Sequence, residues 1–441
     1  MIKTRFAPSP TGMMHIGGVR TALYAYLVAK KNNGVFSLRI EDTDRNRFVS
    51  GATEDIIANM RWLGLNFEEP PIIQSDRKEI YKQYANELVK EGAAYEKDGA
   101  IWFKMPQTGQ LKFTDLIGNR EVVFDLKDQK DFVLLKSDGF PTYHLAHVVD
   151  DHEMETNPVI RADEWMSSVP KHILTFQALG WEVPEYAHLP LILGTDRSKL
   201  SKRHGAMGVS EFRKDGFLPE AILNYMALLG WTPPGDKEII TLEDMIKAFS
   251  LKDVHSTPAV FDITKLEWMN GEYIRKSQIS KLKSQIWEYL MEISGEALAK
   301  VEHPTEDEIE KVIPLIKDRI KKLSDFVPLT DFLWEKPEYD KAQFEKLVPS
   351  GVEGVNIKDQ KDVLGKIMEK LEAMEKPWQA EVFEKTFRDL ADETGLKAGD
   401  VFQLIRVAVS GQTVTPPLFE SIKILGEDEV VKRVAYLIAL W

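Results

Sequence analysis

The stretch RFAPSPTGMMHIGG, residues 5–18, decides the fold. Apolar Ile2 and Phe6 lead into its loop, and apolar residues with helical spacing follow it from Val19 to Leu27. This pattern predicts a strand, a tight loop and a helix. A helix N-terminus offers unpaired backbone N–H groups to an anion, and glycines let a phosphate approach them closely. The loop is therefore a candidate nucleotide site, although an ordinary strand–helix connection would show the same residues.

The bulk composition limits the classes of protein to consider. The chain has 441 residues, too many for one ordinary core, so several domains are expected. Its net charge of −13 argues against nucleic-acid binding by the whole surface, but it allows a local basic face. Cysteine is absent, which excludes disulfides, thiolate catalysis and cysteine-based zinc sites. We expect no membrane span and no signal peptide, and hence a cytoplasmic protein.

A carboxylate follows the next predicted strand. Apolar Phe36, Leu38 and Ile40 alternate with polar residues, and the run ends at residues 41–44, EDTD. In doubly wound sheets the ligand lies beyond the carboxyl ends of the strands. Glu41 is therefore expected in the same crevice as the first loop. For its neighbours at 42 and 44, both aspartates, a solvated turn or a turn cap is the favoured interpretation.

The rest of the chain changes character twice. Short apolar runs at 101–103, 122–124 and 132–135, separated by polar turns, predict a small α+β module inserted in an α/β fold. Beyond residue 205 the pattern becomes helical, with Pro219 at the start of one helix and a capping-box spacing at 305–308. We therefore divide the chain at 1–90, 91–137, 138–205, 206–285 and 286–441.

A basic loop at 194–205 lies between these regions. Its lysines, Lys199 and Lys202, are three residues apart and would suit the growing negative charge of a leaving pyrophosphate. Each feature also has a plain structural interpretation. The lysines could form a solvated charge run, and His15 could simply cap a helix.

Several motifs together resemble a known family. Residues 8–12 with 15–18 are similar to the HIGH signature of class I aminoacyl-tRNA synthetases, and residues 199–203, KLSKR, to their KMSKS loop. Further motifs, at residues 5–12, 39–44 and 148–152, resemble those of bacterial glutamyl-tRNA synthetases. The resemblance to this family covers essentially the whole chain. The resemblance implies a Rossmann-like parallel sheet, an inserted α+β module that binds the acceptor stem at 91–137, a helical stem-contact domain at 206–285 and an all-α anticodon-binding domain at 286–441.

The resemblance also implies site residues. The implied catalytic residues are His15, Lys199 and Lys202. The implied glutamate-binding residues are Arg5, Ala7, Ser9, Glu41, Tyr143, His147 and Arg161. The implied ATP-binding residues are Pro8, Thr11, Gly12, His15, Gly17, Gly18, Glu164, Lys199, Leu200, Ser201, Lys202 and Arg203. In the basic cluster at 317–322, placed on the capped helix, Arg319 matches the position that reads the last anticodon base. Which arginine holds which glutamate carboxylate stays open.

By the same resemblance, the chain is expected to attach L-glutamate to tRNA(Glu) through a glutamyl-adenylate. ATP with Mg²⁺ is the co-substrate, and no protein-bound metal and no structural zinc are expected. Action on tRNA(Gln) stays open, and a monomer is the default. The alternatives are a small-molecule nucleotidylyltransferase, a tRNA-binding protein without activity and a glutaminyl-tRNA synthetase. The first needs no long helical half, and the last would end in β-barrels.

Overall fold

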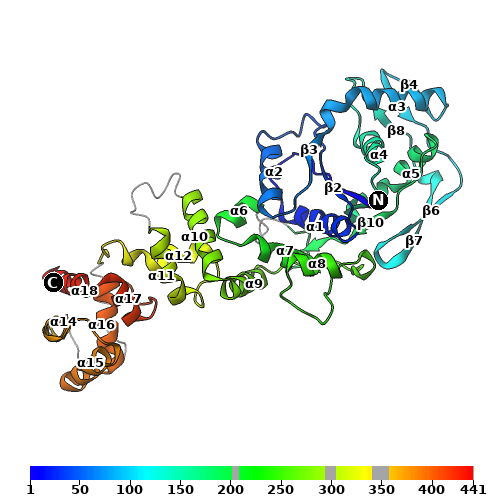
Figure 1. Cartoon of the computed structure of the whole chain (residues 1–441). Coiled ribbons are helices and arrows are strands. Elements are labelled where there is room, and N and C mark those ends of the chain that lie inside the picture. The colour runs from blue at the N-terminus through cyan, green and yellow to red at the C-terminus, as the bar shows by residue number, and fades with distance from the viewer. Residues whose placement is uncertain (201–207, 294–303, 340–356, 441) are drawn as a thin grey trace. The chain divides into compact units, whose positions relative to one another are not determined.

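The N-terminal stretch folds as its pattern predicts. In the computed structural model, which describes residues 1–200, 208–293, 304–339 and 357–440, β1 (Lys3–Phe6) leads through a loop into α1 (Ile16–Lys31). The apolar positions of α1 are buried, including Val19, Leu23 and Leu27. The helix therefore lies inside the unit rather than on its surface (Figure 1).

This helix packs against a parallel sheet. β1 pairs with β2 (Val35–Ile40), and β2 pairs with β3 (Glu68–Ile73). On the other side β9 (Val159–Ala162) pairs in parallel with β10 (Tyr186–Leu189). The backbone N–H of Asn157 donates to the carbonyl oxygen of Lys3 at 2.8 Å, which places the start of β9 beside β1. The predicted parallel α/β sheet is confirmed.

One residue of β2 differs from the simple alternation. Arg39 occupies a polar position of the pattern, yet its side chain is fully buried. A parallel sheet covered on both faces buries both sets of side chains, so alternation does not identify the solvent face. The buried guanidinium therefore needs partners inside the protein.

The segment at 91–137 forms two sheets. β4 (Ala94–Lys97), β5 (Ala100–Phe103) and β8 (Phe132–Leu135) make a small antiparallel sheet that shares a core with α3 (Lys78–Lys90). β6 (Gln110–Asp115) and β7 (Arg120–Asp125) make a hairpin, and Asp115 pairs in parallel with Tyr186 of β10. The hairpin thus extends the parallel sheet at its edge (Figure 1). The sequence patterns had indicated only three of these five strands.

Further elements complete the first compact unit, Met1–Asn270. The helices are α2 (Ala52–Trp62), α4 (Tyr143–Glu153), α5 (Val169–Ala178), α6 (Val209–Lys214), α7 (Pro219–Leu228), α8 (Leu242–Ala248) and α9 (Ile263–Lys276), which runs on into the second unit. The 3₁₀ turns are η1 (Gln74–Arg77), η2 (Ile117–Asn119), η3 (Leu126–Asp128), η4 (Asp163–Ser168) and η6 (Leu251–Asp253), and β11 (Ile192–Leu193) pairs with β12 (Ala259–Val260). Pro219 begins α7, as predicted.

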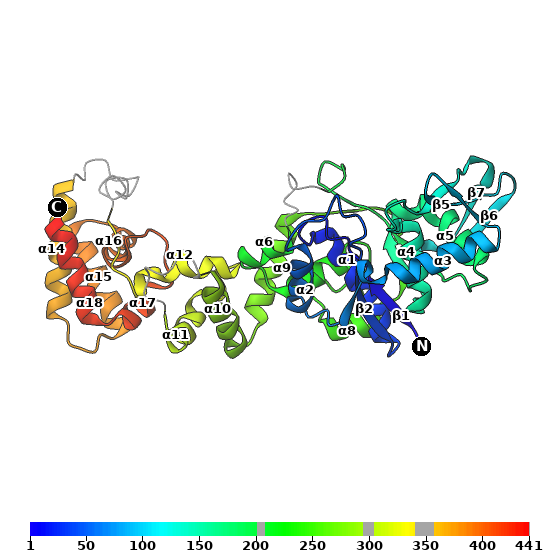
Figure 2. The same cartoon turned by 90° about the horizontal axis from the view of Figure 1, so that it is seen from above.

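The second compact unit, Gly271–Trp441, contains only helices in its described part. They are α10 (Ile279–Ile293), α11 (Glu306–Ile316), η7 (Leu323–Asp325), α12 (Phe326–Thr330), η8 (Asp331–Leu333), α14 (Ile357–Ala373), α15 (Ala380–Thr394), α16 (Ala398–Ser410), α17 (Leu418–Leu425) and α18 (Glu427–Leu440). The helices α14–α18 gather around one core that contains Phe387, Ile405 and Val434 (Figure 2). The capping box of Thr305 and Glu308 is confirmed at the start of α11. None of the helices in the described parts of the chain could cross a membrane.

Candidate active site

All seven residues implied for glutamate binding line one cavity of about 190 Å³. They are Arg5, Ala7, Ser9, Glu41, Tyr143, His147 and Arg161. They come from β1 and the loop after it, from the residue that follows β2, and from α4 and β9. The carboxyl ends of parallel strands meet at one edge of a sheet, which explains why residues so far apart in sequence converge.

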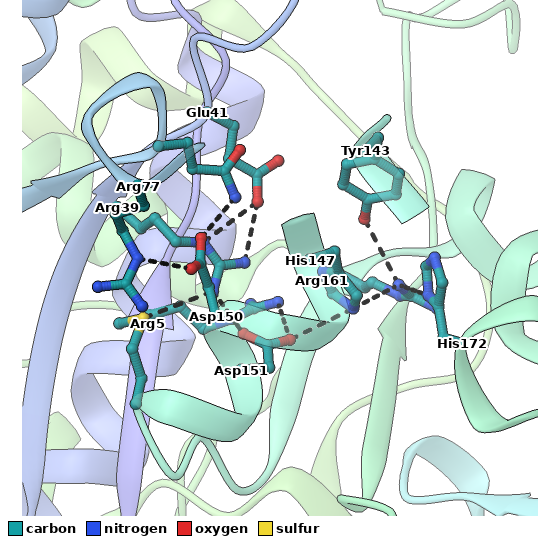
Figure 3. A network of polar contacts seen from close by, with 12 residues as sticks. Arg5, Arg39, Glu41, Arg77, Tyr143, His147, Asp150, Asp151, Arg161 and His172 are labelled. Carbon is teal, nitrogen blue, oxygen red and sulfur yellow. Dashed lines mark hydrogen bonds and ion pairs between the residues drawn. The ribbon is translucent and has the colours of Figure 1, made fainter. Parts of the chain in front are cut away.

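One wall of the cavity is an alternating chain of charges (Figure 3). The Arg5 guanidinium donates to both carboxylate oxygens of Asp151, with distances of 2.9 and 3.2 Å. Arg39 Nη1 donates to the same carboxylate at 2.7 Å, and Arg39 Nη2 donates to Glu41 Oε1 at 2.9 Å. All four side chains are buried. Charged hydrogen bonds of this kind fix the direction of each side chain.

The charge states of this wall follow from burial and pairing. Burial would raise the pKa of Asp151, but Arg5 and Arg39 outweigh it and lower the pKa to about 2. For Glu41 burial prevails over the attraction of Arg39, so its pKa is raised above the ordinary value. Burial also raises the pKa of Tyr143 to about 12, which keeps its hydroxyl protonated. Asp151 therefore remains a fixed negative charge at neutral pH.

The opposite wall holds Arg161 among neutral groups. Its Nε donates to His188 Nε2 at 3.0 Å, and its Nη1 lies 3.0 Å from His172 Nδ1 and 3.2 Å from His147 Nε2. The side chain is 5% exposed. Within the described ranges no carboxylate lies at ion-pair distance from Arg161. This guanidinium is therefore a buried positive charge without a carboxylate partner among those residues.

The histidines around Arg161 stay neutral. Burial lowers the pKa of His147 and of His172 well below the ordinary value, and the nearby charge of Arg161 lowers both further. Burial likewise lowers the pKa of His188. His144, next to His172 at 3.1 Å, has its pKa lowered to about 4, again mainly by burial. A ring of neutral imidazoles thus surrounds one cation.

The residues implied for ATP binding begin at the N-terminus of α1. His15 is the N-cap residue, and its Nδ1 accepts the backbone N–H of Gly17 at 3.0 Å. A Cβ at Gly17 would lie 3.2 Å from that same Nδ1, and a Cβ at Gly18 would lie 3.4 Å from the ring of Phe6. The structural interpretation of His15 as a capping group is therefore correct, and it leaves the imidazole at the positive end of a 16-residue helix.

The remaining implied ATP residues divide into described and undescribed ones. Pro8, Thr11 and Gly12 lie in the loop between β1 and α1, where Thr11 N–H donates to the Ser9 carbonyl at 2.8 Å. Lys199 Nζ donates to Glu164 at 2.9 Å, so these two side chains meet. Leu200 follows, with its N–H 3.2 Å from the Ile192 carbonyl oxygen. Ser201, Lys202 and Arg203 lie outside the described residues.

The turn-cap interpretation of Asp42 is also correct. This carboxylate is buried, and its Oδ1 accepts the backbone N–H of Ser75 at 2.8 Å. Asp44 is exposed, at the rim of a second hollow of about 390 Å³ that shares Ser9, Glu41 and Tyr143 with the first.

Sequence reasoning missed the partners that hold the site together. They are Arg39, Asp151, His172 and His188, together with Trp165, which lies over Tyr143 with ring centroids 4.2 Å apart. One signal was present: His147 and Asp151 are four residues apart and share a face of α4, where His147 Nε2 lies 3.3 Å from Asp151. Arg39 is only two residues from Glu41, whereas His172 and His188 come from elements distant in sequence.

Arg319 lies in the second unit. Its Nη1 donates to the Thr415 carbonyl at 2.8 Å, and Arg406 Nε donates to the Thr415 hydroxyl at 3.1 Å. The placement of the basic cluster on the capped helix was wrong, because α11 ends at Ile316 and the cluster follows it. Pro314 within α11 removes one backbone donor, in keeping with this early end. In the described part of the chain no group of three or more acidic or histidine side chains could hold a metal ion.

Comparison with known proteins agrees with this geometry. The family profile "tRNA synthetases class I (E and Q), catalytic domain" matches residues 1–100 and 96–268, and the profile "Anticodon binding domain" matches 282–438. The fold and the cavity at the carboxyl edge of its sheet are thus those of a class I tRNA synthetase.

Individual relatives narrow the class. The glutamate–tRNA ligase of Dehalococcoides mccartyi is 41% identical to the chain, and the alignment covers 99% of the chain and 98% of that ligase. The glutamate–tRNA ligase of Treponema denticola is 38% identical, and the alignment covers 99% of both proteins. The crystal structure of a glutamate tRNA ligase from Elizabethkingia meningosepticum, in complex with its amino acid, has a TM-score of 0.83 at 30% identity and 99% coverage of both chains. The chain belongs to the glutamate–tRNA ligase family.

Proposed function

We propose that this protein attaches L-glutamate to the 3′ end of tRNA(Glu) with consumption of ATP, through a glutamyl-adenylate. The observation that carries the proposal is the cavity in which buried Arg161, without a described carboxylate partner, faces Glu41. A guanidinium suits a carboxylate, and a carboxylate suits an ammonium. L-Glutamate carries both groups.

The charge of the site favours glutamate over glutamine. The walls of the cavity are formed or supported by the guanidiniums of Arg5, Arg39 and Arg161 and by the carboxylates of Glu41 and Asp151. The histidines beside Arg161 are neutral. Arg161 has no carboxylate at ion-pair distance among the described residues, so a carboxylate of L-glutamate would give it its direct partner. The neutral side-chain amide of glutamine would leave this buried guanidinium without one, which is costly.

The reaction we propose needs positioning more than acid–base chemistry. A glutamate carboxylate oxygen attacks the α-phosphorus of ATP and displaces pyrophosphate. The N–H groups at the start of α1, with His15, would bind phosphate oxygens, and Lys199 and Lys202 would stabilise the charge that develops on the leaving group. Mg²⁺ accompanies ATP as part of the substrate. Because the nucleophile is already ionised, no general base is required.

ATP–pyrophosphate exchange tests this proposal. With the purified protein, exchange should depend on L-glutamate and on tRNA(Glu), and should be at background with L-glutamine or L-aspartate. Lys202→Ala should lower it by orders of magnitude while the far-ultraviolet circular dichroism stays unchanged. Exchange with glutamine equal to that with glutamate would contradict the assignment of the cavity.

We further propose that Arg319 reads the last anticodon base, and that residues 91–137 contact the acceptor stem. The support for Arg319 is its position next to Thr415 and Arg406, where three polar side chains lie together. Charging assays with tRNA(Glu) and tRNA(Gln) decide whether the enzyme also acts on the second tRNA. We propose a monomer located in the cytoplasm, which sedimentation and cell fractionation test.

A further inference from the structure

We propose that Asp115 and His188 are positioning residues that fix Arg161 for the amino-acid substrate. This inference rests on the proposed function, because it takes Arg161 to be a ligand of the glutamate carboxylate. Neither Asp115 nor His188 lines the cavity, so both act only through Arg161. All three side chains are at least 95% buried, at 0%, 2% and 5% exposure.

The proton positions in this group follow from its donors. Arg161 Nε carries one hydrogen and no lone pair, so His188 Nε2, at 3.0 Å, must accept. The proton of the neutral imidazole is therefore on Nδ1, where Asp115 Oδ2 lies 2.5 Å away and accepts it. The hydrogen bond on one ring nitrogen thus decides the state of the other.

Asp115 is itself held rigidly. Its Oδ1 accepts the backbone N–H of Ile117 at 2.8 Å, and the backbone N–H of His188 lies 3.2–3.3 Å from its two oxygens. Asp115 is also the residue of β6 that pairs with Tyr186 of β10. The β6–β7 hairpin therefore contributes a carboxylate that orients a side chain of the neighbouring strand, β10.

An amide in place of the Asp115 carboxylate would reverse this arrangement. If the amide kept its oxygen toward the two backbone N–H groups, its nitrogen would present an N–H to His188 Nδ1. His188 would then accept at Nδ1 and carry its proton on Nε2. Two donors, His188 Nε2 and Arg161 Nε, would face each other, so Arg161 would have to turn away.

The experiment measures Michaelis constants for glutamate, ATP and tRNA(Glu) in charging assays with the full-length protein. We expect Asp115→Asn and His188→Leu to raise KM for glutamate about ten-fold or more, the effect of one charged hydrogen bond, and to leave KM for ATP and for tRNA unchanged. His188→Gln should recover most of the loss, because the glutamine oxygen can accept from Arg161 Nε in the manner of the imidazole Nε2.

Asp131→Asn is the matched control. Asp131 lies in the same inserted segment and accepts hydrogen bonds from the Met105 N–H and the Tyr95 hydroxyl, at 2.8 and 3.0 Å. Its hydrogen-bond partners are thus different from those of Asp115. This variant makes the same charge change, so KM for glutamate should stay at the wild-type value. If His188→Leu does not fold, the KM for glutamate of Asp115→Asn is compared with that of His188→Gln and of Asp131→Asn. A larger KM in Asp115→Asn than in the other two supports the positioning role.

Arg161→Leu separates the two hypotheses. If Arg161→Leu raises KM for glutamate but Asp115→Asn and His188→Leu do not, the positioning role is wrong and the proposed function stands. If Arg161→Leu leaves KM for glutamate unchanged, the amino-acid site is assigned wrongly and the positioning role falls with it. Equal increases in all three Michaelis constants for Asp115→Asn would indicate a general structural defect and would also overturn the positioning role.

Discussion

At the scale of single residues, buried charge explains most of the site. Arg39 is completely buried, donates to the carboxylates of Glu41 and Asp151 and lies 3.9 Å from that of Asp150. Its pKa is raised, because the attraction of the neighbouring carboxylates outweighs burial. Removing such a partner leaves charges buried and unpaired, which is far more damaging than losing an exposed ion pair.

Arg39→Met should therefore destabilise the protein strongly. We expect a loss of about 3–5 kcal/mol in the free energy of unfolding, since Glu41 and Asp151 both lose a partner. Urea unfolding measures this loss. Hydrogen exchange of the α4 amides reports on the stability of the first unit by itself. The control is Arg388→Met, which breaks an exposed pair with Glu384 and should cost less than about 1 kcal/mol. Equal losses in the two variants would contradict this account.

The neutral histidines predict a loss of stability in mild acid. The pKa values of His144, His147 and His172 are lowered in the folded protein, so the unfolded chain binds more protons below its histidine pKa of about 6.5. The contribution of these neutral histidines to the free energy of unfolding is thus fully present above about pH 6.5. It falls as the pH drops toward about 4, the pKa of His144.

His144→Gln should flatten this decline, by roughly 1 kcal/mol per pH unit at most. Denaturant midpoints measured between pH 7.5 and about 4.5 test the prediction. Asp151, whose pKa is about 2, does not contribute in this window, because its stabilising charge is lost only below about pH 4. An equal pH dependence in the wild type and in His144→Gln would contradict the assignment of this decline to His144.

At the scale of elements, the loop–helix junction at α1 is built for close approach. His15 caps the helix through the Gly17 N–H, and both glycines at the start of α1 have a near neighbour where a Cβ would stand. Gly18 would meet the ring of Phe6, and Gly17 would meet the cap itself. A side chain is thus crowded at Gly17, whereas at Gly18 it would make ordinary van der Waals contact with Phe6.

Gly17→Ala should weaken ATP binding without changing glutamate binding. The new methyl group would lie 3.2 Å from His15 Nδ1, so the imidazole must move and the cap is disturbed. We expect KM for ATP to rise about ten-fold, the effect of one charged hydrogen bond. Gly365→Ala, a helical glycine of α14 with open space around its Cα, is the control and should be neutral. An unchanged KM for ATP would argue against phosphate binding at this junction.

At the scale of the whole molecule, the chain divides its tasks between two compact units. The cavity and its charged walls belong entirely to Met1–Asn270, whereas Arg319 and its partner Thr415 belong to Gly271–Trp441. Each unit has its own buried core. Changes in one unit should therefore affect one step of the proposed reaction and spare the other.

Arg319→Gln tests this division. Loss of the guanidinium should raise the charging of tRNA(Gln) relative to tRNA(Glu) by about ten-fold, since one charged contact to the base is lost. KM for glutamate should not change. Arg388→Gln, an exposed arginine of the same unit, is the control. If the wild-type protein charges both tRNAs equally, Arg319 does not discriminate between them.

The sequence by itself determined the strand–loop–helix start, the place of Glu41 at a strand end and the helical second half. Those features depend on local periodicity and on the geometry of parallel sheets, which each segment encodes on its own. The stretch at 5–18 even contained the two contrasting parts of the site, with Arg5 at one end and the capping His15 at the other.

Only the tertiary structure decided what holds the charges in place. The partners of Arg161 come from α4, α5 and β10, and the carboxylate behind His188 comes from a hairpin that sequence patterns did not join to the sheet. Arg39 occupies a polar position of an alternating strand, and the structure shows that it is buried. The physical reason is that burial and pairing depend on elements distant in sequence, and a local pattern carries no information about them.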